Sequence, residues 1–525
     1  MRGRRSVSVR SSSWHPRVLA GLIGAIAVLA IGPAAAAASP PSISVQGNHF
    51  VNGAGQTVRL LGVNHASFEY ACVDGYGYDD GHMDAPDAAA IAAWHATAVR
   101  VPLNEDCWLG LNGQPNSSQS SETLTQSGYQ KAVEEYVEDL NEAGLYAILD
   151  LHWSAPGSHV ADGQRPMPDD HSAAFWTSVA STFKLDPAVV FDAFNEPYSP
   201  AEVNDPSHPV GWSCWESGGC TVPTVADGNP PNGTTYQAVG MQALVTAIRS
   251  TGARQPILLG GLGYANNLSE WLSHEPSDPD GQLAASFHNY QGEACERPSC
   301  WNAEVAPVAK RVPVVTGEFD QDVCGPSGFD DEYMNWADEH GVSYLAWGWW
   351  VLTQQEIGDD GCSAYYLISD YSGTPAAPNG VNLHGHLLAL AAGAGAGGSG
   401  GPGPHASHVL RLLAFRAWVA SDGSSLKLLL RFDQKGHGVV RAATVKPFAL
   451  GARRHRAPVS LGSTRFEVSA GKDKTVGLGL SGPSRTLLAR RHRLEVRFTI
   501  SLTDEAGQRV VAHRTATLEL VAQRG

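Results

Sequence analysis

The sequence lacks several features that would point to particular classes of protein. No CxxC pair occurs among its eight cysteines, which disfavours a structural zinc site. No glycine-rich phosphate loop follows the first apolar run, at residues 58–64, which disfavours a doubly wound sheet. Only 17% of the residues are charged and 43% are hydrophobic, a balance typical of a soluble globular chain. At 525 residues the chain is long enough for more than one domain.

Long apolar runs are also lacking, with one exception near the start of the chain. Residues 18–32 are apolar but too few to span a bilayer comfortably. Five arginines precede this run and small residues at 34–38 follow it, which is the layout of an export signal. We therefore expect residues 1–38 to be a signal peptide, Ser39 to begin the mature chain, and the protein to be secreted and free of membrane. An uncleaved anchor is the alternative, and Arg4 and Arg5 leave the twin-arginine route open.

An exported chain with eight cysteines is expected to form disulfides. The sequence does not fix the connectivity, because eight cysteines allow many sets of pairs. Local spacing suggests the short loops Cys214–Cys220 and Cys295–Cys300 and the longer staples Cys72–Cys107 and Cys324–Cys362.

The net charge of −16 hides an uneven distribution along the chain. Residues 408–525 contain 21 Lys and Arg against 8 Asp and Glu, whereas residues 39–390 carry a net charge of −34. An acidic body argues against nucleic acid or an anionic glycan as the main partner and suits a neutral substrate. Arginine clusters at 453–456 and 490–493 leave open a weak contact with cell wall or another anionic polymer, although a solvated basic surface is the simpler interpretation.

A Gly/Ala-rich linker at 391–407 separates two regions of different periodicity. Residues 39–390 alternate short apolar runs with helix-like stretches, which indicates β/α units and a parallel sheet. The apolar runs lie at 58–64, 96–103, 145–153, 189–195, 256–262, 283–290, 312–318 and 342–350. Eight such units predict an α/β fold of the (β/α)8 TIM barrel type. Residues 408–525 show alternating strands instead and predict a small all-β, sandwich-like C-terminal domain.

Two of the apolar runs end on a glutamate, Glu196 in VVFDAFNEPY and Glu318 in VPVVTGEFD. In a TIM barrel the carboxyl ends of all strands meet at one face, where the chemistry takes place. Two carboxylates aimed at one bond suit hydrolysis of a glycosidic bond. One protonates the leaving oxygen, and the other attacks the sugar carbon or activates water. The two glutamates are therefore the candidate catalytic pair.

Other polar and aromatic residues gather at the same strand ends. They are Asn64, His65, Arg100, His152, Trp153, Asn195, His288, Tyr290, Trp347 and Trp349. Any one of them, taken alone, is more often a core or hydrogen-bonded side chain than a substrate contact. Their presence on most of the predicted strands indicates a shared pocket.

The motifs at these strand ends resemble those of glycoside hydrolase family 5, the cellulase family. They are GVNHASFEY at 62–70, VRVPLNEDCW at 99–108, ILDLHW at 148–153, FNEP at 194–197, FHNY at 287–290, TGEF at 316–319 and AWGWW at 346–350. The resemblance covers residues 45–390 and implies a retaining mechanism, with Glu196 as acid/base and Glu318 as nucleophile. Glu196 must start protonated, so we expect partial burial and a carboxylate neighbour to raise its pKa.

The resemblance also implies supporting roles around the pair. These roles are Arg100 and Tyr290 to orient the nucleophile, Asn195 to bind the sugar 2-hydroxyl, His152 and His288 to line the cleaved sugar, and Trp347 to stack on it. His65 is a further supporting candidate. For Trp153, Trp108 and Trp349, a stacking role and a place in the core are equal alternatives.

Carboxylates outside the pair have simpler interpretations. Asp150 shares the strand face of His152 and is placed to support it from inside the barrel. Glu105, Asp106 and Asp320 lie in or beside loops, where a solvated or loop-capping role is expected. We expect neither a metal ion nor a cofactor.

The leading interpretation is a secreted, monomeric endo-β-1,4-glucanase that acts on a neutral β-linked polysaccharide. A β-mannanase or another β-glycanase is the alternative within the family, because membership does not set the sugar. The alternative outside this class is a non-catalytic glycan-binding barrel, which the presence of both glutamates disfavours. The C-terminal domain matches no carbohydrate-binding module, so its role is open.

Overall fold

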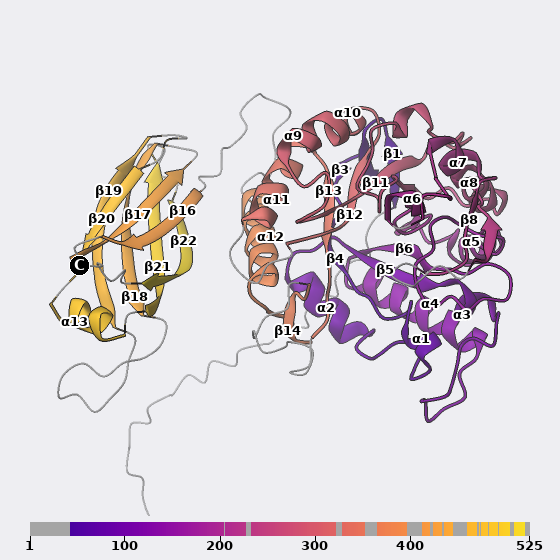
Figure 1. The fold of residues 1–525 in the computed structure, drawn as a ribbon, viewed down its shortest axis with the longest axis horizontal. Helices are drawn as coiled ribbons and strands as arrows, with labels where there is room; N and C mark the ends of the chain where they lie inside the picture. The colour runs from indigo at the N-terminus through magenta and orange to yellow at the C-terminus, as the bar shows by residue number, and fades with distance from the viewer. Residues whose placement is uncertain are drawn as a thin grey trace, which may run out of the picture. The chain divides into compact units, whose positions relative to one another are not determined.

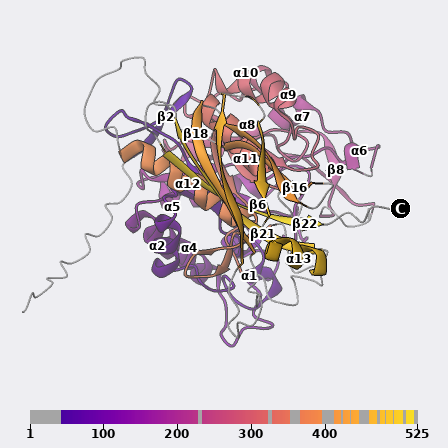
Figure 2. The same cartoon turned by 90° about the vertical axis from the view of Figure 1, so that its left-hand side faces the viewer.

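The computed structural model describes two stretches of the chain, each with gaps. The described residues are 42–203, 205–226, 233–321, 328–351, 365–395, 412–420, 424–432, 435–444, 459–469, 472, 474–480, 482–491, 493–504 and 509–519. They fall into two compact units that divide between Ala392 and Gly393. The first unit alternates strands with helices, and the second is built mainly of strands (Figure 1, Figure 2).

Eight parallel strands close into a barrel in the first unit (Figure 1). In chain order they are β4 (Leu61–Asn64), β5 (Ala98–Asn104), β6 (Tyr146–Trp153), β7 (Val189–Asp192), β10 (Ile257–Gly260), β11 (Leu283–Tyr290), β12 (Val314–Asp320) and β13 (Ser343–Ala346). Each strand pairs in parallel with the next, and β13 pairs back with β4. The predicted (β/α)8 TIM barrel is confirmed.

Helices follow the strands around the outside of the barrel (Figure 1). The longer ones are α2 (Ala85–Ala93), α4 (Gln126–Glu142), α5 (Ser172–Phe183), α8 (Met241–Ser250), α11 (Phe329–His340) and α12 (Asn379–Gly395). Shorter ones are α1 (Ala71–Asp74), α3 (Glu105–Leu109), α6 (Pro200–Val203), α7 (Trp212–Ser217), η1 (Trp271–Ser273), α9 (Pro298–Cys300), η2 (Trp301–Val305) and α10 (Ala306–Ala309).

The helix α4 illustrates why these segments are helical. At its start, the Thr125 hydroxyl accepts a hydrogen bond from the backbone N–H of Gly128 and so satisfies a donor that has no partner within the helix. Tyr129, Val133 and Tyr136 recur at helical spacing, and all three are buried. That apolar stripe fixes which face of α4 packs on the strands.

The interior of the barrel changes character along its axis. Residues two apart on a strand share a face, so Ile148, Asp150 and His152 on β6 all point inward. Ile148 belongs to an apolar cluster at the amino-terminal end of the barrel, whereas Asp150 and His152 lie nearer the carboxyl-terminal end. The barrel therefore has an apolar floor and a polar upper layer, and the polar layer is where the chemistry of this fold takes place.

Short strands complete the first unit. They are β1 (Ile43–Gln46), β2 (His49–Asn52) and β3 (Thr57–Val58) in one sheet, β8 (Thr221–Pro223) with β9 (Thr235–Gln237), and β14 (Ile368–Asp370) with β15 (Thr374–Pro375). Ile43 and Phe50, from β1 and β2, join the apolar floor. This hairpin therefore closes the amino-terminal end of the barrel.

The second unit contains two antiparallel sheets. One has the order β16 (Leu412–Val419), β17 (Ser425–Phe432), β20 (Lys474–Gly479), and the other β19 (Ser460–Val468), β18 (Gly436–Thr444), β21 (Arg493–Asp504), β22 (Arg509–Glu519). Residues from both sheets form one apolar core, as the predicted all-β domain requires. The helix α13 (Gly482–Arg491) was not predicted, because its apolar residues are too few to show a helical period.

The predicted linker begins later than the composition suggests. The helix α12 continues past residue 390 to Gly395, because its alanine-rich end favours helix. Its Leu383 and Leu387 are each only 1% exposed and pack in the core of the first unit. The remainder of the predicted linker lies outside the described residues.

Three of the four suggested disulfides are present, namely Cys72–Cys107, Cys214–Cys220 and Cys295–Cys300. Cys324 and Cys362 lie outside the described residues, as does the predicted signal peptide. Within the part of the chain that the structure describes, no helix is long and apolar enough to cross a membrane.

The packing of α12 predicts where the chain can be shortened. A chain that ends at Gly395 should keep the melting temperature of the first unit, whereas one that ends at Pro378 loses Leu383 and Leu387. Removal of a buried leucine side chain costs about 2–5 kcal/mol, so the shorter chain should melt several degrees lower. Differential scanning calorimetry of the two chains measures this difference, and failure of the Gly395 chain to fold would contradict the division into two units.

Candidate active site

Glu318 reaches the barrel interior because β12 contains an irregularity. The pairing of β11 with β12 shifts between Phe287 and His288, so that Gly317 is skipped and His288 pairs with Glu318. A Cβ on Gly317 would lie 2.8 Å from His288 Nε2 and 3.0 Å from Ser286 Oγ, so only glycine fits there. The skipped residue turns the Glu318 side chain inward, where simple alternation from Val315 would not place it.

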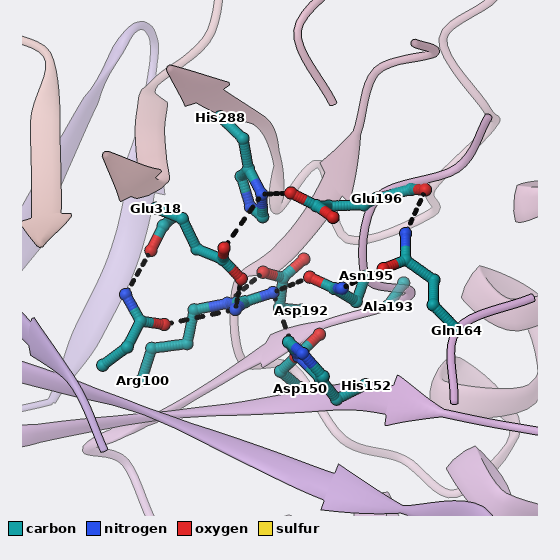
Figure 3. A network of polar contacts seen from close by, with 12 residues as sticks. Arg100, Asp150, His152, Gln164, Asp192, Ala193, Asn195, Glu196, His288 and Glu318 are labelled. Atoms are coloured by element: carbon teal, nitrogen blue, oxygen red, sulfur yellow. Dashed lines mark hydrogen bonds and ion pairs between the residues drawn. The ribbon is translucent and has the colours of Figure 1, made fainter. Parts of the chain in front are cut away.

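Arg100 on β5 lies at the centre of a buried network (Figure 3). Its side chain is fully buried. Its Nη1 lies 2.7 Å from Glu318 Oε1, its Nε 2.9 Å from Asp192 Oδ2, and its Nη2 3.0 Å from Asp150 Oδ2. A single guanidinium therefore holds three carboxylates from three other strands.

The same guanidinium also fixes two amides. Nη1 donates to Asn64 Oδ1 at 3.2 Å, and Nη2 donates to Asn195 Oδ1 at 2.9 Å. Asn64 Nδ2 in turn donates to the backbone carbonyl of Gly317 at 2.8 Å, next to Glu318. Asn64 thus links the Arg100 side chain to the backbone of Gly317, the skipped residue of β12.

Glu318 receives a second hydrogen bond. The Tyr290 hydroxyl donates to its Oε2 at 2.7 Å, and His288 Nδ1 lies 3.7 Å from the same oxygen. A charged donor and a phenol therefore hold the two oxygens of this side chain in place.

Glu196 follows β7 in a strained backbone conformation, with φ of 44°. Gln164 Nε2 donates to its backbone carbonyl at 2.8 Å, and Glu196 Oε1 lies 2.9 Å from His288 Nδ1 (Figure 3). Burial raises the pKa of Glu196 to about 8, against the opposing effect of Arg100. A carboxyl group of this kind holds its proton at neutral pH.

The two candidate catalytic carboxyls face each other across a short gap. One oxygen of Glu196, one oxygen of Glu318 and a nitrogen of His288 all lie within 4.8 Å of one another. These donor atoms could also hold a metal ion. Burial lowers the pKa of His288 to about 4, so the imidazole is neutral at pH 7 and adds no positive charge to the pair.

His152 is held in one orientation from below. Its Nδ1 lies 2.6 Å from Asp150 Oδ2, which also contacts Arg100. Burial lowers the pKa of His152 to about 3 and raises the pKa of Asp150 to about 7, with Arg100 opposing the second shift. The His152 ring stacks on Trp347, with the ring centres 5.5 Å apart and an interplanar angle of 9°.

A comparison of the chain with protein families identifies the family to which it belongs. The family model described as cellulase, glycosyl hydrolase family 5, matches residues 51–352. This chain belongs to glycosyl hydrolase family 5. The matched residues include every strand of the barrel and both glutamates.

Individual relatives of this family 5 chain are distant. It is 25% identical over 359 residues to a mannan endo-1,4-beta-mannosidase of Streptomyces lividans, a match that covers 66% of this chain and 76% of that protein. It is 27% identical over 246 residues to endoglucanase 1 of Saitozyma flava, covering 44% of this chain and 60% of that one, which is less than two thirds of its length. Among solved structures, a beta-glucanase of Saccharophagus degradans is 19% identical with a TM-score of 0.48, and the match covers 67% of this chain and 94% of that chain.

The family 5 barrel brings most of the predicted site residues together. Six are joined in the network around the two carboxyls, namely Arg100, Asn195, Glu196, His288, Tyr290 and Glu318. His152 and Trp347 form the stacked pair beside it. Trp153 is only partly buried, and its ring centre lies 6.5 Å from that of Tyr70.

Other predicted residues lie elsewhere. His65 Nε2 lies 3.2 Å from Asp87 Oδ2, and Trp349 Nε1 donates to Asp87 Oδ1, so both residues support the chain behind the site. Trp108 is fully buried and donates to Ser178. The core alternative is therefore correct for Trp108 and Trp349.

The expectation of solvated carboxylates was wrong for Glu105, Asp106 and Asp320. All three are at most 1% exposed. Asp106 does hold a loop, because it accepts hydrogen bonds from the Ala161 N–H and the Asn112 amide. Their burial could not be predicted from the sequence, because chain segments distant in sequence cover these side chains.

Two contributors to the site and one buried carboxyl outside the Arg100 network were missed. Asp192 follows Val190 by two residues and shares its inward face, so the alternation of β7 carried the signal. Gln164 comes from the irregular segment between β6 and α5, where no period exists to reveal it. Glu69 lies after β4, is 3% exposed, and accepts the Ser67 N–H at 2.7 Å.

Buried carboxyls in this region make stability depend on pH. Burial raises the pKa of Glu69 from 4.5 to about 8, so between these values the unfolded chain is ionised while the folded chain keeps the proton. Unfolding then releases a proton, and the free energy of unfolding falls as pH rises from about 5 to about 8. At about 1.4 kcal/mol per pKa unit, Glu69 alone contributes a loss of about 4 kcal/mol.

We expect Glu69→Gln to flatten this dependence, because glutamine is neutral at every pH. Thermal melts of the parent and the variant at pH 5 and pH 8 measure the effect. Glu135→Gln is the matched control, since the Glu135 side chain is 61% exposed. An unchanged slope in Glu69→Gln would show that other groups carry the pH dependence.

Proposed function

We propose that this chain is a retaining β-glycanase in which Glu318 is the nucleophile and Glu196 the acid/base. One observation carries the proposal: two carboxyls within 4.8 Å experience opposite environments. Arg100 and Tyr290 hydrogen-bond Glu318, while burial raises the pKa of Glu196 to about 8. Retaining enzymes hold their carboxyls about 5–5.5 Å apart, and inverting enzymes about 6.5–9.5 Å.

In the first step, Glu196 gives its proton to the leaving glycosidic oxygen while a Glu318 oxygen attacks the anomeric carbon. The C–O bond to the leaving sugar breaks, and a glycosyl ester on Glu318 forms. Glu196 is then ionised and removes a proton from water, which attacks the same carbon and releases Glu318. His288 lies beside Glu196 but is neutral, so it does not form an ion pair with the Glu196 carboxylate.

The surrounding side chains suit a sugar in the cleaved position. Arg100 holds Asn195 Oδ1, and Asn195 Nδ2 donates one hydrogen to Gln164 Oε1 at 3.4 Å. The second hydrogen of Nδ2 is left for the sugar 2-hydroxyl, a contact that strengthens in the transition state. His152 has Nδ1 turned to Asp150, so Nε2 is the nitrogen available to a sugar hydroxyl. Trp347 offers an aromatic face to the apolar face of the ring.

For the substrate we propose a neutral β-1,4-linked glucan cut internally, with mannan as the second candidate. The strongly acidic body supports a neutral polymer over an anionic one. The printed names of the relatives, a mannan endo-1,4-beta-mannosidase and an endoglucanase, support these two sugars. A non-catalytic glycan-binding barrel is disfavoured, because binding alone would not require a carboxyl with a raised pKa to face a second carboxyl that is bonded to an arginine.

We also propose that residues 1–38 direct secretion and are removed, and that the basic C-terminal unit has a separate role outside the reaction. The layout of the leader and the disulfides support export. The C-terminal unit supplies none of the residues of the Arg100 network described above.

A substrate panel tests the proposal. Purified protein is incubated with a soluble cellulose derivative, galactomannan and xylan, and the release of reducing ends is measured. We expect release from the cellulose derivative together with a rapid fall in viscosity, because internal cuts shorten a polymer quickly. Faster release from galactomannan would make mannan, and not glucan, the preferred substrate. No release from any of these β-glycans would refute the proposed enzymatic activity.

Replacing each of the two glutamates should reduce the activity in a different way. Glu318→Ala should abolish turnover, and azide should restore it with inverted product, because the small anion replaces the missing nucleophile. Glu196→Ala should lose a factor of about 10²–10⁴, and least with a good leaving group that needs no proton. Glu270→Ala is the control and should keep full activity, since its side chain is 61% exposed. Azide rescue with retained configuration in Glu318→Ala would reverse the two roles.

A further inference from the structure

Glu196 is held in a backbone conformation that residues with a side chain rarely adopt. Its φ of 44° lies in the left-handed region, where the Cβ comes too close to the backbone. Such a conformation persists only where the surrounding structure fixes it. The contacts of this peptide therefore decide where the Glu196 carboxyl points.

The side-chain contact that fixes this peptide comes from Gln164. Its Nε2 donates to the Glu196 backbone carbonyl at 2.8 Å (Figure 3). Among the residues that the structure describes, no other group donates a hydrogen bond to that carbonyl. The peptide after Glu196 is therefore held by one side chain from a different segment of the chain.

Gln164 also contacts the residue before the glutamate. Its Oε1 accepts a hydrogen bond from Asn195 Nδ2 at 3.4 Å, while Arg100 Nη2 lies 2.9 Å from the other end of the same amide, Oδ1. The Asn195 amide is thereby fixed in position and in orientation. Gln164 thus contacts both residues that follow β7 and face the sugar in the proposed mechanism.

The segment that carries Gln164 is held in place without any substrate. Arg165 is 3% exposed, and its Nη2 donates to the Val160 carbonyl at 3.0 Å and to Asp162 Oδ1 at 2.9 Å. Its Nη1 donates to the Gly163 carbonyl at 3.1 Å. One buried guanidinium therefore closes this loop on itself, so Gln164 projects from a fixed support.

A backbone hydrogen bond attaches the same loop to the chain beyond Glu196. The Tyr198 N–H donates to the Pro166 carbonyl at 3.0 Å, two positions further along both segments than the bond between Gln164 and Glu196. A change in the Glu196 backbone is thus resisted at two points. Of these, only the Gln164 bond can be removed by replacing a side chain.

We propose that Gln164 is a positioning residue, which holds the Glu196 carboxyl and the Asn195 amide where the first chemical step requires them. The inference rests on the proposed function, in which Glu196 protonates the leaving oxygen. A proton is transferred only over hydrogen-bond distance, so a displacement of about 1 Å in the carboxyl can slow the step by about 100-fold.

The proposed nucleophile does not depend on the same contact. Arg100 and Tyr290 hold the Glu318 carboxyl, and both come from other strands. Removal of the Gln164 side chain should therefore slow protonation of the leaving oxygen more than attack on the sugar carbon. A general role in folding would instead slow both events equally.

The test compares leaving groups on aryl β-glycosides of the disaccharide that the substrate panel selects. We expect Gln164→Ala to lower kcat/KM about 10- to 100-fold for a phenyl glycoside, whose poor leaving group needs the proton. For a dinitrophenyl glycoside, which needs no proton, kcat/KM should change far less. Gln130→Ala is the matched control and should keep both values, because the Gln130 amide donates to a backbone carbonyl away from the site, that of Trp108 at 2.9 Å.

Gln164→Glu tests the donated hydrogen bond itself. The new carboxyl has nearly the same size and still accepts from Asn195, but it can donate to the Glu196 carbonyl only while it is protonated. Relative to the parent, kcat/KM for the phenyl glycoside should therefore be highest near pH 4 and fall towards pH 6, since an ordinary glutamate has a pKa of about 4.3. Glu196 itself keeps its proton over this range, because burial raises its pKa to about 8.

The outcomes separate this inference from the proposed function. Equal losses with both leaving groups in Gln164→Ala, or parental values with both, would overturn the positioning role while Glu196→Ala still shows the dependence on the leaving group. If Gln164→Ala does not fold, as its melting curve reports, the pH profile of Gln164→Glu decides, and a loss that does not vary with pH overturns the role. If Glu196→Ala shows no dependence on the leaving group, the proposed acid/base is wrong and this inference falls with it.

Discussion

The contact on which the rest of the site depends is that of Arg100 with three carboxylates. A fully buried guanidinium cannot lose its proton, so it supplies a permanent positive charge inside the barrel. Asp150, Asp192 and Glu318 share this one charge, and burial raises the pKa of Asp150 to about 7 and that of Asp192 to about 6. The arginine therefore both joins four strands and limits how much negative charge the pocket can hold.

That limit explains how two glutamates in one pocket come to lie in different environments. Glu318 receives the guanidinium and the Tyr290 hydroxyl, while the Glu196 carboxyl lies beside the neutral imidazole of His288. The strained backbone of Glu196 and the shifted register of β12 then aim the two groups at each other. For the proposed acid and the proposed nucleophile, the difference thus comes from the neighbours and not from the residue type.

Much of this was readable in the sequence, and the remainder was hidden for physical reasons. The alternation of apolar runs with helical stretches predicted the barrel, because each strand is buried on both faces and each helix on one. The glutamates at the ends of β7 and β12 stood out, because acidic residues interrupt apolar runs there. Gln164 and the burial of Glu105 did not, since their surroundings are built by loops that have no period. The register shift at Gly317 was equally invisible, because it depends on how closely β11 approaches.

The apolar floor of the barrel has a consequence for how this protein can change. The cluster that includes Ile148 and the hairpin residues Ile43 and Phe50 supplies cohesion at one end of the axis, while crowded carboxyls at the other end oppose it. The part of the barrel that stabilises the fold and the part that carries the reactive groups therefore lie at opposite ends of the barrel axis. Substitutions at the carboxyl-terminal end of the barrel can therefore change which sugar fits, while the apolar floor keeps the fold stable.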